Sequence, residues 1–432
     1  MAIPVDIPDN TESLHDIGEY VLSYQPAMNA FVDALVNRIA MTLVTSRMWN
    51  NPWAPFKRGY IEFGETIEEV FVNIAKPYSY DPDAAAETLF KREIPDVRTA
   101  FHSMNWQKVY KVTVSNDQLR TAFLSWGGIT DLIARIVDSL YTGMSKDEYL
   151  SMKYMLCREA LNGGIYPVTT SAIEGAGADP EEAVISFRTY SGLMNFLTDE
   201  YNRAGVENSC ATENQIIIIP AAIEARISVK VLAAAFNMSE ADYLGSRVRA
   251  DSFTFNDGDM NRLAELFAKD TTYTPFTEGE LTTLSHILAM TLDKDYWMCF
   301  DNFQQVTQNY NGLGLYWQYF YHAWKTFSVS PFVDAILYTT DANAVTGVTV
   351  TPSTVTLAPG SDSTFTAVVA GTGLYSKAVN WSVSGQGKGG TSINALNGLL
   401  HVAADETAET LTVKCVSVAD STKFGTSTVT VS

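Results

Sequence analysis

The sequence predicts an α+β body followed by a smaller all-β domain, and three observations support this class. The chain has 432 residues, more than a single hydrophobic core usually covers. Helix-like and strand-like patterns both occur before about residue 342. After that point the sequence changes to short alternating runs of Val, Thr, Ser and Gly. We therefore expect a domain boundary between Ala342 and Thr346, with only strands beyond it.

Composition excludes two broad classes of protein. Hydrophobic residues make up 46% and charged residues 18% of the chain, which is far from the signature of disorder. The formal net charge is -20, and such a chain repels the phosphate backbone that a nucleic-acid reader must neutralise. The part after the boundary has four lysines and five acidic residues, so its net charge is -1 and the remaining -19 belongs to the larger part. The charge permits a container for DNA and argues against a sequence-specific reader.

The cysteines and the N-terminus indicate the compartment. Four scattered cysteines, with no C-x-x-C, predict neither a disulfide framework nor a zinc site. The first twelve residues have no basic region and no apolar run, so they do not form a signal peptide, and no apolar stretch reaches transmembrane length. We expect a protein that is made and kept in a cytoplasm, without a membrane partner.

The C-terminal part carries the pattern of a β-sandwich. Six alternating runs with turn residues between them are expected as strands: Val348–Val350, Phe365–Val369, Val379–Val383, Leu399–Val402, Leu411–Val413 and Val429–Val431. The region resembles the group 2 bacterial immunoglobulin-like domain in its V-x-V-x-P, L-x-x-G, W-S-V-S, G-L-L and closing V-x-V, which stand here at Val348–Pro352, Leu357–Gly360, Trp381–Ser384, Gly398–Leu400 and Val429–Val431. The resemblance implies an all-β sandwich over 346–432 and is silent on a ligand.

Two helices are expected in the middle of the body. Apolar residues from Ser125 to Tyr141 recur at the spacing of one helical face. A second helix is expected to start at Ser145, where Ser145 and Glu148 match a capping box, and to end near Gly163. Together they predict a long, nearly continuous helical spine.

A long hairpin is expected beside the spine. The segments Val70–Ile74 and Val109–Val114 alternate as strands do, and a polar segment with several prolines, Lys76–Pro95, separates them. Such an arm buries little surface against its own domain, so we expect it to lie on a neighbouring subunit.

The rest of the body reads as an α+β subdomain and an aromatic segment. From Tyr166 to about Asn311 we expect a turn-rich opening at Gly175–Pro180, a strand at Gln215–Ile219 and a helix at Val229–Phe236. The stretch Leu313–Tyr338 is dense in aromatic residues and predicts a buried strand pair or an interface.

Several segments of the body, in order, resemble the major capsid proteins of the phi29 group of podoviruses. The matching segments are Gly64–Glu69, Phe90–Pro95 and Thr99–His102 in the region Gly59–Tyr110, followed by Thr121–Gly127, Leu232–Met238, Asp295–Asn302, Gly314–His322 and Ser328–Ser330. The similarity covers roughly 57–342, and the appended β-domain agrees with it. The region of roughly 170–228 matches the family least.

The resemblance implies the Hong Kong 97 capsid fold and a shell-building role. Its parts would be an N-terminal arm at about 1–45, an extended loop at 57–112, a peripheral domain at about 113–165 and 312–342, and an axial domain at about 166–311. Copies of the chain would form the pentamers and hexamers of an icosahedral or prolate head. The implied partners are a scaffolding protein, a portal protein and packaged double-stranded DNA, bound through non-specific contacts.

No residue is predicted to be catalytic, cofactor-binding or metal-binding. The literal G-x-G-x-x-G at Gly385–Gly390 lies among strands with no helix following, so we expect a loop. Three small groups of polar residues suggest calcium, general acid–base and metal sites in turn, but each has a simpler interpretation. We expect a solvated turn at Asn256, Asp257 and Asp259, and charges bracketing a buried strand at Asp293, Asp295 and Asp301. The histidines are expected to be core or surface residues: His15, His102, His286, His322 and His401. No nucleophile elbow and no P-loop occurs in the sequence.

Two alternatives remain open at this stage. One is a bacterial surface adhesin or carbohydrate-binding protein with an immunoglobulin-like module, against which the missing signal peptide counts. The other is an intracellular enzyme with an accessory β-domain, which needs convergent polar residues in a pocket. A capsid protein should form megadalton particles, whereas an adhesin or enzyme should remain a small species.

Overall fold

The computed structural model describes residues 49–62, 64–75, 96–115, 128–227, 246–388, 390–395 and 397–432. These form two compact units, each assembled from separate stretches of the chain. The first unit is drawn from the described parts of Met1–Glu65, Ser103–Ser151 and Cys299–Phe327, and the second from those of Thr66–His102, Met152–Met298 and Ser328–Ser432. Within the described ranges, no helix is both long and apolar enough to cross a bilayer.

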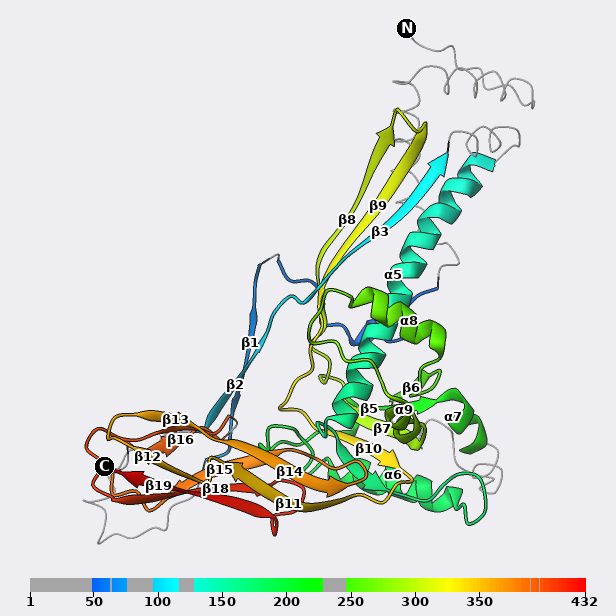
Figure 1. The fold of residues 1–432 in the computed structure, drawn as a ribbon. Helices are drawn as coiled ribbons and strands as arrows, with labels where there is room; N and C mark the ends of the chain where they lie inside the picture. Colours follow the sequence, from blue (N-terminus) through cyan, green and yellow to red (C-terminus); the bar gives the residue numbers. More distant parts are fainter. Residues whose placement is uncertain are drawn as a thin grey trace, which may run out of the picture. The chain divides into compact units, whose positions relative to one another are not determined.

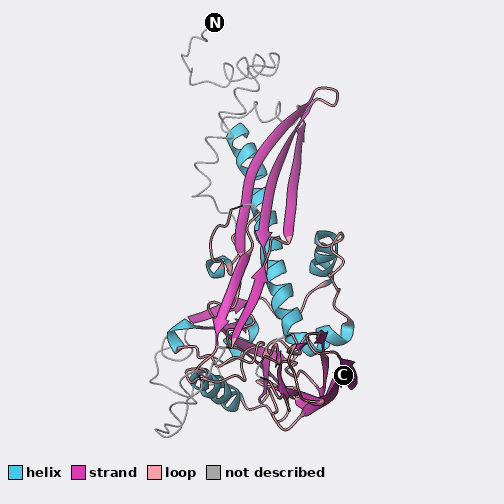
Figure 2. Ribbon diagram, turned by 90° about the vertical axis from the view of Figure 1, so that its left-hand side faces the viewer, coloured by secondary structure: helices cyan, strands magenta, loops and turns pink. Residues whose placement is uncertain are grey.

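The first unit consists of a three-stranded antiparallel sheet and most of a long helix, whose residues from Met152 onward belong to the second unit. The sheet has the order β3-β9-β8, and a short 3-10 turn, η2, precedes it in the chain. The bounds are η2 Ala54–Phe56, β3 Trp106–Ser115, β8 Phe300–Asn311, β9 Tyr316–Thr326 and α5 Gly128–Leu161. The strands run alongside α5 (Figures 1 and 2), and the rings of Tyr141 and Tyr321 lie 4.7 Å apart between helix and sheet. Aromatic burial therefore fixes the sheet to the helix.

The predicted spine is one helix rather than two. Helix α5 runs without a break past Ser145, so the predicted helix start and capping box there are wrong. Ser145 is buried at 9% exposure, and the Glu148 carboxylate binds two lysines and an asparagine instead of the backbone. The helix ends at Leu161, two residues before Gly163, near which its end was predicted. The segment before Gly128, including the predicted start at Ser125, lies outside the described residues.

The hairpin exists, but its second strand is not the predicted one. Strand β1 (Ile67–Val72) pairs antiparallel with β2 (Val97–His102), whereas β3, which holds the predicted Val109–Val114, pairs with β9. The predicted pairing is wrong. The inward positions of β2 carry the polar residues Arg98 and His102, which are buried, so the sequence of β2 does not show the apolar alternation expected of a strand. The connecting segment Lys76–Pro95 lies outside the described residues.

A five-stranded sheet forms the core of the second unit. Its order is β4-β10-β7-β5-β6, with β4 parallel to β10, β5 parallel to β6, and β7 antiparallel to both of its neighbours. The strands are β4 Tyr166–Thr169, β5 Gln215–Pro220, β6 Ser246–Ala250, β7 Ile287–Asp293 and β10 Ala335–Thr339. Every residue of β5, β7 and β10 is buried, as expected of central strands covered on both faces. The predicted strand Gln215–Ile219 is confirmed as β5.

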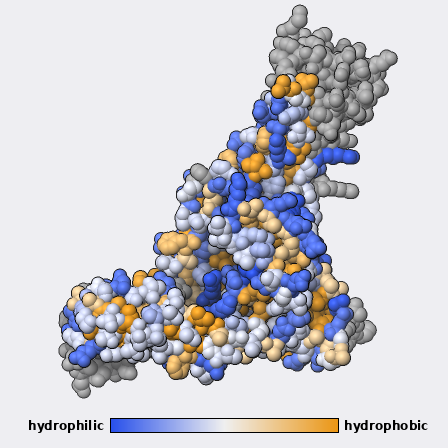
Figure 3. Space-filling model, viewed as in Figure 1, coloured by the Kyte–Doolittle hydropathy of each residue, from blue (hydrophilic) through white to orange (hydrophobic). Residues whose placement is uncertain are grey.

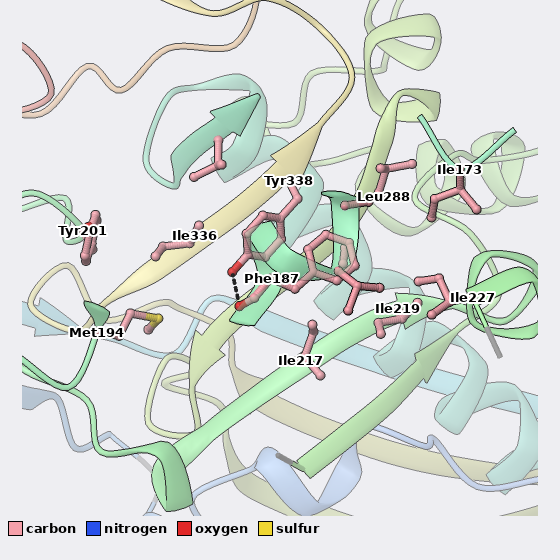
Figure 4. Packing of buried hydrophobic residues seen from close by; sticks show 14 of the residues in the cluster. Ile173, Phe187, Met194, Tyr201, Ile217, Ile219, Ile227, Leu288, Ile336 and Tyr338 are labelled. Atoms are coloured by element: carbon pink, nitrogen blue, oxygen red, sulfur yellow. Dashed lines mark hydrogen bonds between the residues drawn. The ribbon is translucent and has the colours of Figure 1, made fainter. Parts of the chain in front are cut away.

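Helices lie around this sheet, and one of them packs on a hydrophobic cluster of buried residues. The helices are α6 Pro180–Leu193, η3 Thr212–Asn214, α7 Ala221–Ile227, α8 Asp257–Leu266 and α9 Glu278–Ser285. Helix α6 begins where Asp179 accepts two backbone N–H bonds and Pro180 takes the first helical position. Its Phe187 packs on Tyr338 of β10 with ring centroids 4.5 Å apart, inside the cluster shown in Figure 4. The predicted helix Val229–Phe236 lies outside the described residues.

The C-terminal part of the second unit contains only strands, as predicted. The strands are β11 Ala344–Thr351, β12 Thr354–Leu357, β13 Asp362–Thr364, β14 Thr366–Thr372, β15 Val379–Ser384, β16 Ser392–Ile393, β17 Leu399–His401, β18 Thr410–Ser417 and β19 Phe424–Val431. They form sheets of order β11-β14, β12-β19-β18-β15 and β13-β17-β16. Their shared core includes Phe365, Trp381 and Leu411. All six predicted strand runs fall within or next to these strands.

Candidate functional site

The β1–β2 hairpin carries an apolar surface on its outer face. The exposed side chains are Val70, Val72 and Ile74 on the β1 side and Val97 and Phe101 on β2, each between 45% and 68% exposed. They share one face because Val72 pairs with Val97 and side chains alternate along each strand. We call these five residues the hairpin face. Exposed apolar side chains in one contiguous row are typical of a protein–protein contact.

The inner face of the hairpin is fixed to the rest of the second unit. Phe71 stacks on Phe332 with ring centroids 5.7 Å apart. The buried Arg98 guanidinium donates to the carbonyl oxygens of Ala204 and Gly205 and is also bound by Asp96. An inward arginine is stable here because its N–H groups find acceptors. The hairpin is thus a rigidly held arm with its apolar side turned outward.

The C-terminal strands are seated on the same unit through close backbone contacts. The Lys377 N–H donates to the carbonyl oxygen of Gly163 at 2.9 Å, just after α5 ends. The Asn380 side-chain oxygen accepts a hydrogen bond from the Arg98 guanidinium at 3.4 Å, and its amide nitrogen donates to the Asp199 carboxylate at 3.4 Å. Gly205 has a positive φ of 59°, and a Cβ there would meet Asn380 at 2.8 Å. The position of the C-terminal strands on this unit therefore depends on the close approach of Gly205 and Asn380.

A buried cluster of opposite charges lies in the first unit. The Glu148 carboxylate of α5 binds the ammonium groups of Lys325 and Lys57, the latter at 3.1 Å, and accepts from Asn51 Nδ2 at 2.7 Å. Asp301 binds the same two lysines at 2.7 Å each. We call these five residues the charge cluster. It ties the segment before the hairpin to α5, β8 and β9.

The charge cluster keeps its acids ionised and Lys57, whose side chain is 17% exposed, protonated. Burial would raise the pKa of the Glu148 and Asp301 carboxyl groups, but Lys325 and Lys57 outweigh burial and hold both pKa values below their ordinary range. Burial lowers the pKa of Lys57, and the two carboxylates reverse this, so that its pKa lies above the ordinary value. The geometry is suited to holding segments together, since every charge present already has an opposite neighbour.

Two further ionisable groups are deeply buried in the second unit. Lys153 of α5 is fully buried; its ammonium binds both oxygens of Asp251 at 2.9 and 3.0 Å and the Thr254 carbonyl oxygen at 2.8 Å. Asp334 is also fully buried, and burial, aided by the charge of Asp293, raises the pKa of its carboxyl to about 7. Lys153 holds the loop that contains Asp251 and Thr254 against helix α5. The ionised form of Asp334 costs free energy, because burial removes its hydration.

The glycine motif is a loop around a carboxylate. The backbone N–H of Gly387 donates to Glu406 at 2.8 Å, and those of Thr407 and Ala408 donate to the same oxygen. These bonds and the Thr391 hydroxyl lower the pKa of the Glu406 carboxyl to about 2, with Thr391 the largest cause. The donors that a phosphate would need are used by the protein itself, in keeping with the expected loop.

The other residues weighed from sequence do not converge into a site. Asn256 caps α8 and accepts from the Asp259 N–H, so that segment is a helix start and not the turn expected. Asp301 belongs to the charge cluster, while Asp293 lies in the other unit. Within the described residues, no three His, Cys, Asp or Glu side chains gather as a metal would require. Sequence reasoning missed the charge cluster, because its members come from four distant stretches.

The described histidines each face a polar group. His286 binds Asp341, His401 binds Asp362 and His322 lies 3.3 Å from the Thr307 hydroxyl. His102 lies between Glu69 and Ser328. His15 lies outside the described residues.

Comparison with known proteins gives a consistent set of relatives. The family model described as the phi29-like phage major capsid protein matches residues 7–339. The major capsid protein of Bacillus phage B103 is 34% identical over 94% of this chain and 84% of its own, and that of Bacillus phage PZA is 32% identical over 95% and 85%. The capsid structure of Staphylococcus phage Andhra matches with a TM-score of 0.52 at 15% identity, covering 69% of this chain and 86% of that one. The last likeness concerns the fold alone.

Proposed function

The chain belongs to the family of phi29-like phage major capsid proteins, and from this membership we propose how its copies contact one another. The protein is a structural component of a bacteriophage virion, and copies of it build the capsid shell. Its body has the Hong Kong 97 type of capsid fold. The alternative of a surface adhesin is set aside, because the relatives are capsid proteins. Shell building requires no chemical step from this chain, so we assign it no enzymatic role in assembly.

The subunits tile into pentamers and hexamers, with the hairpin face of one subunit lying on its neighbour. The observation that carries this proposal is the outward position of Val70, Val72 and Phe101, each more than half exposed, on an arm that buries Arg98 and His102. Burial of apolar area is the main favourable term in association. On its own chain the hairpin face has no cover among the described residues.

The chain divides, in our proposal, into the parts of a capsid subunit and an appended domain. These are an N-terminal arm at 1–45, an extended loop at 57–112, a peripheral domain at 113–165 and 312–342, an axial domain at 166–311, and an immunoglobulin-like sandwich at 346–432. The arm lies outside the described residues. The paired strands around Phe365 and Trp381 support the sandwich, which we place on the outer face of the shell.

The further partners are those a DNA-filled head needs. We propose a scaffolding protein during assembly, a portal protein at one vertex, and packaged double-stranded DNA held through non-specific contacts. The net charge of -20 keeps DNA from adhering tightly to the wall. A chain ending after Asp341 tests the appended domain: loss of all shells would make that domain an assembly element and not a decoration.

A pair of threonine substitutions tests the hairpin face. Val70→Thr with Val72→Thr keeps the side-chain shape and the strand preference but replaces a methyl with a hydroxyl at two exposed positions. Val368→Thr, at an exposed position of β14 outside the hairpin, is the matched control. Each protein is mixed with a scaffolding protein and examined by size exclusion and negative-stain electron microscopy.

The expected result separates folding from assembly. The double variant should melt like the unsubstituted protein and yield few closed shells, while the control should assemble normally. Shells formed by the double variant at the unsubstituted yield would show that the hairpin face is not a subunit contact.

A further inference from the structure

Glu69, His102 and Ser328 form a hydrogen-bonded chain that shell building does not use. The Ser328 Oγ lies 2.8 Å from His102 Nδ1, and His102 Nε2 lies 3.1 Å from the Glu69 carboxylate. Glu69 belongs to β1, His102 to β2, and Ser328 follows β9. The other Glu69 oxygen accepts from the Ser330 hydroxyl at 2.8 Å, which fixes the carboxylate plane. His102 is only 3% exposed.

The order of donors and acceptors in this chain is set by the carboxylate. An ionised carboxylate only accepts hydrogen bonds, so His102 Nε2 carries the proton that it shares with Glu69. In the neutral ring Nδ1 is then the acceptor, and the Ser328 hydroxyl donates to it. A serine that donates to an imidazole held from behind by a carboxylate is the arrangement that activates a nucleophile.

The serine, unlike the histidine, is open to solvent through a cavity. Ser328 is partly exposed and lines a cavity of about 540 Å³ together with His102, Phe101, Arg203 and Lys377. The volume admits a small ester, and the wall combines an aromatic side chain with two cationic ones. Arg203 is partly committed, because it also binds Glu159 at 3.0 Å.

The residue after the serine supplies a donor for a negatively charged oxygen. Ser328 exchanges two backbone hydrogen bonds with Met298, and the Ser330 N–H donates to Tyr296. Bonds in an antiparallel ladder alternate, so the Val329 N–H between them points to the opposite side, and no partner for it occurs among the described residues. Val329 lines the cavity. The backbone N–H after the nucleophile is a common part of an oxyanion hole.

We propose that Ser328 is a nucleophile, that His102 is its general base and that Glu69 is its positioning residue, for small carboxylic esters entering this cavity. Ser328 Oγ attacks the ester carbonyl carbon, and its proton passes to His102 Nδ1. The carbon–oxygen bond to the alcohol breaks, and the leaving alcohol takes that proton. Water then attacks the acyl-serine, giving its proton to His102 and restoring the serine. The net reaction consumes one ester and one water and produces one acid and one alcohol.

A fluorophosphonate probe tests the nucleophile without assuming a natural substrate. Attack by Ser328 Oγ forms an oxygen–phosphorus bond, breaks the phosphorus–fluorine bond and releases fluoride together with the seryl proton. The full chain is incubated with the probe, and peptide mass spectrometry locates the adduct. We expect Ser328 to be labelled in the unsubstituted protein.

Substitutions separate an activated serine from a structural hydrogen-bond chain. Ser328→Ala should lose the adduct, and His102→Gln should slow labelling at least 100-fold, in the range typical of a lost general base. Ser382→Ala is the matched control: it removes an exposed serine of β15 that does not line the cavity, and it should keep labelling within a few-fold. Glu69→Gln should shift the pH profile of labelling, which a purely structural role would not do.

Two labelling results would overturn the proposal. An unsubstituted, folded protein that gives no adduct at Ser328, under conditions that fully label a known serine hydrolase, overturns it and leaves the chain as a tie between hairpin and body. Equal labelling of Ser328→Ala overturns it as well. Hydrolysis of p-nitrophenyl acetate, lost in Ser328→Ala and kept in Ser382→Ala, would extend the result from reactivity to turnover.

Discussion

Replacing Glu148 with glutamine tests whether the charge cluster stabilises the first unit. Glutamine keeps the shape and can still accept from Asn51, but it removes one of the two carboxylates that face Lys57 and Lys325. Breaking a buried ion pair by removing one partner costs about 3–5 kcal/mol, because an uncompensated charge remains. Asp301 still binds both lysines, so we expect the lower end, about 3 kcal/mol.

The assay is thermal unfolding of the unassembled chain, followed by circular dichroism. A loss of about 3 kcal/mol lowers the Tm by about 6–12 °C for a unit of this size class. Glu62→Gln, the same substitution at an exposed position of the same unit, is the control and should leave the Tm unchanged. A Tm for Glu148→Gln within 1 °C of the control at pH 7 would refute the reasoning.

The pH dependence gives a second check on the same cluster. The pKa values of Glu148 and Asp301 are lowered by folding, so their contribution is present above their unfolded values, about 4, and is lost as pH falls through the folded ones. The pKa of Lys57 is raised, so its contribution is present below 10.5 and is lost as pH rises past the folded value. The difference between Glu148→Gln and the unsubstituted protein should therefore be largest between about pH 5 and 10 and shrink near pH 3.

Three further substitutions probe the second unit. Lys153→Met should lower the free energy of unfolding by about 1 kcal/mol in urea titration, because the Thr254 carbonyl oxygen and the Asp251 carboxylate, the latter 54% exposed, lose their partner. Asp334→Asn should stabilise the protein above pH 7. Folding raises the pKa of this carboxyl to about 7, so the stability that its neutral form contributes is lost as pH rises from about 4 through about 7. A plot of Tm against pH should therefore be flatter for the variant. Gly205→Ala should speed tryptic cleavage within the C-terminal strands, because the new methyl group displaces Asn380 in their seat.

Elements set by local pattern could be predicted from the sequence. The strand Gln215–Pro220 is a run of buried aliphatic residues bounded by polar ones, and the C-terminal strands alternate with a period of two. The spine was also predicted, although its break was placed at Ser145. There a local capping signal was outweighed by tertiary contacts, because Glu148 lies opposite two lysines from distant stretches.

Elements set by distant contacts could not be predicted in the same way. Strand β2 carries an alternation of its own, with Val97, Thr99 and Phe101 on one face, but Arg98 and His102 occupy the other and read as polar. That face is buried only because the Ala204 carbonyl oxygen and the Glu69 carboxylate provide acceptors. The charge cluster and the serine–histidine–glutamate chain likewise join residues whose proximity no local spacing reveals.

The hairpin buries the polar side chains of Arg98 and His102 and exposes the apolar residues of the hairpin face, and this arrangement is informative about assembly. A domain that folds for itself alone gains by burying Val72 and Phe101 and by solvating Arg98, yet the structure does the reverse. The five side chains of the hairpin face are about half exposed, so covering them is worth about 1 kcal/mol each, or about 5 kcal/mol per hairpin. That gain is too small to hold two free subunits together against the entropy of association, which is estimated at 4–15 kcal/mol or more. In the arrangement that we propose, every subunit of a closed shell gives and receives such a contact, so the same weak surface is reversible during assembly and strong when the shell is complete.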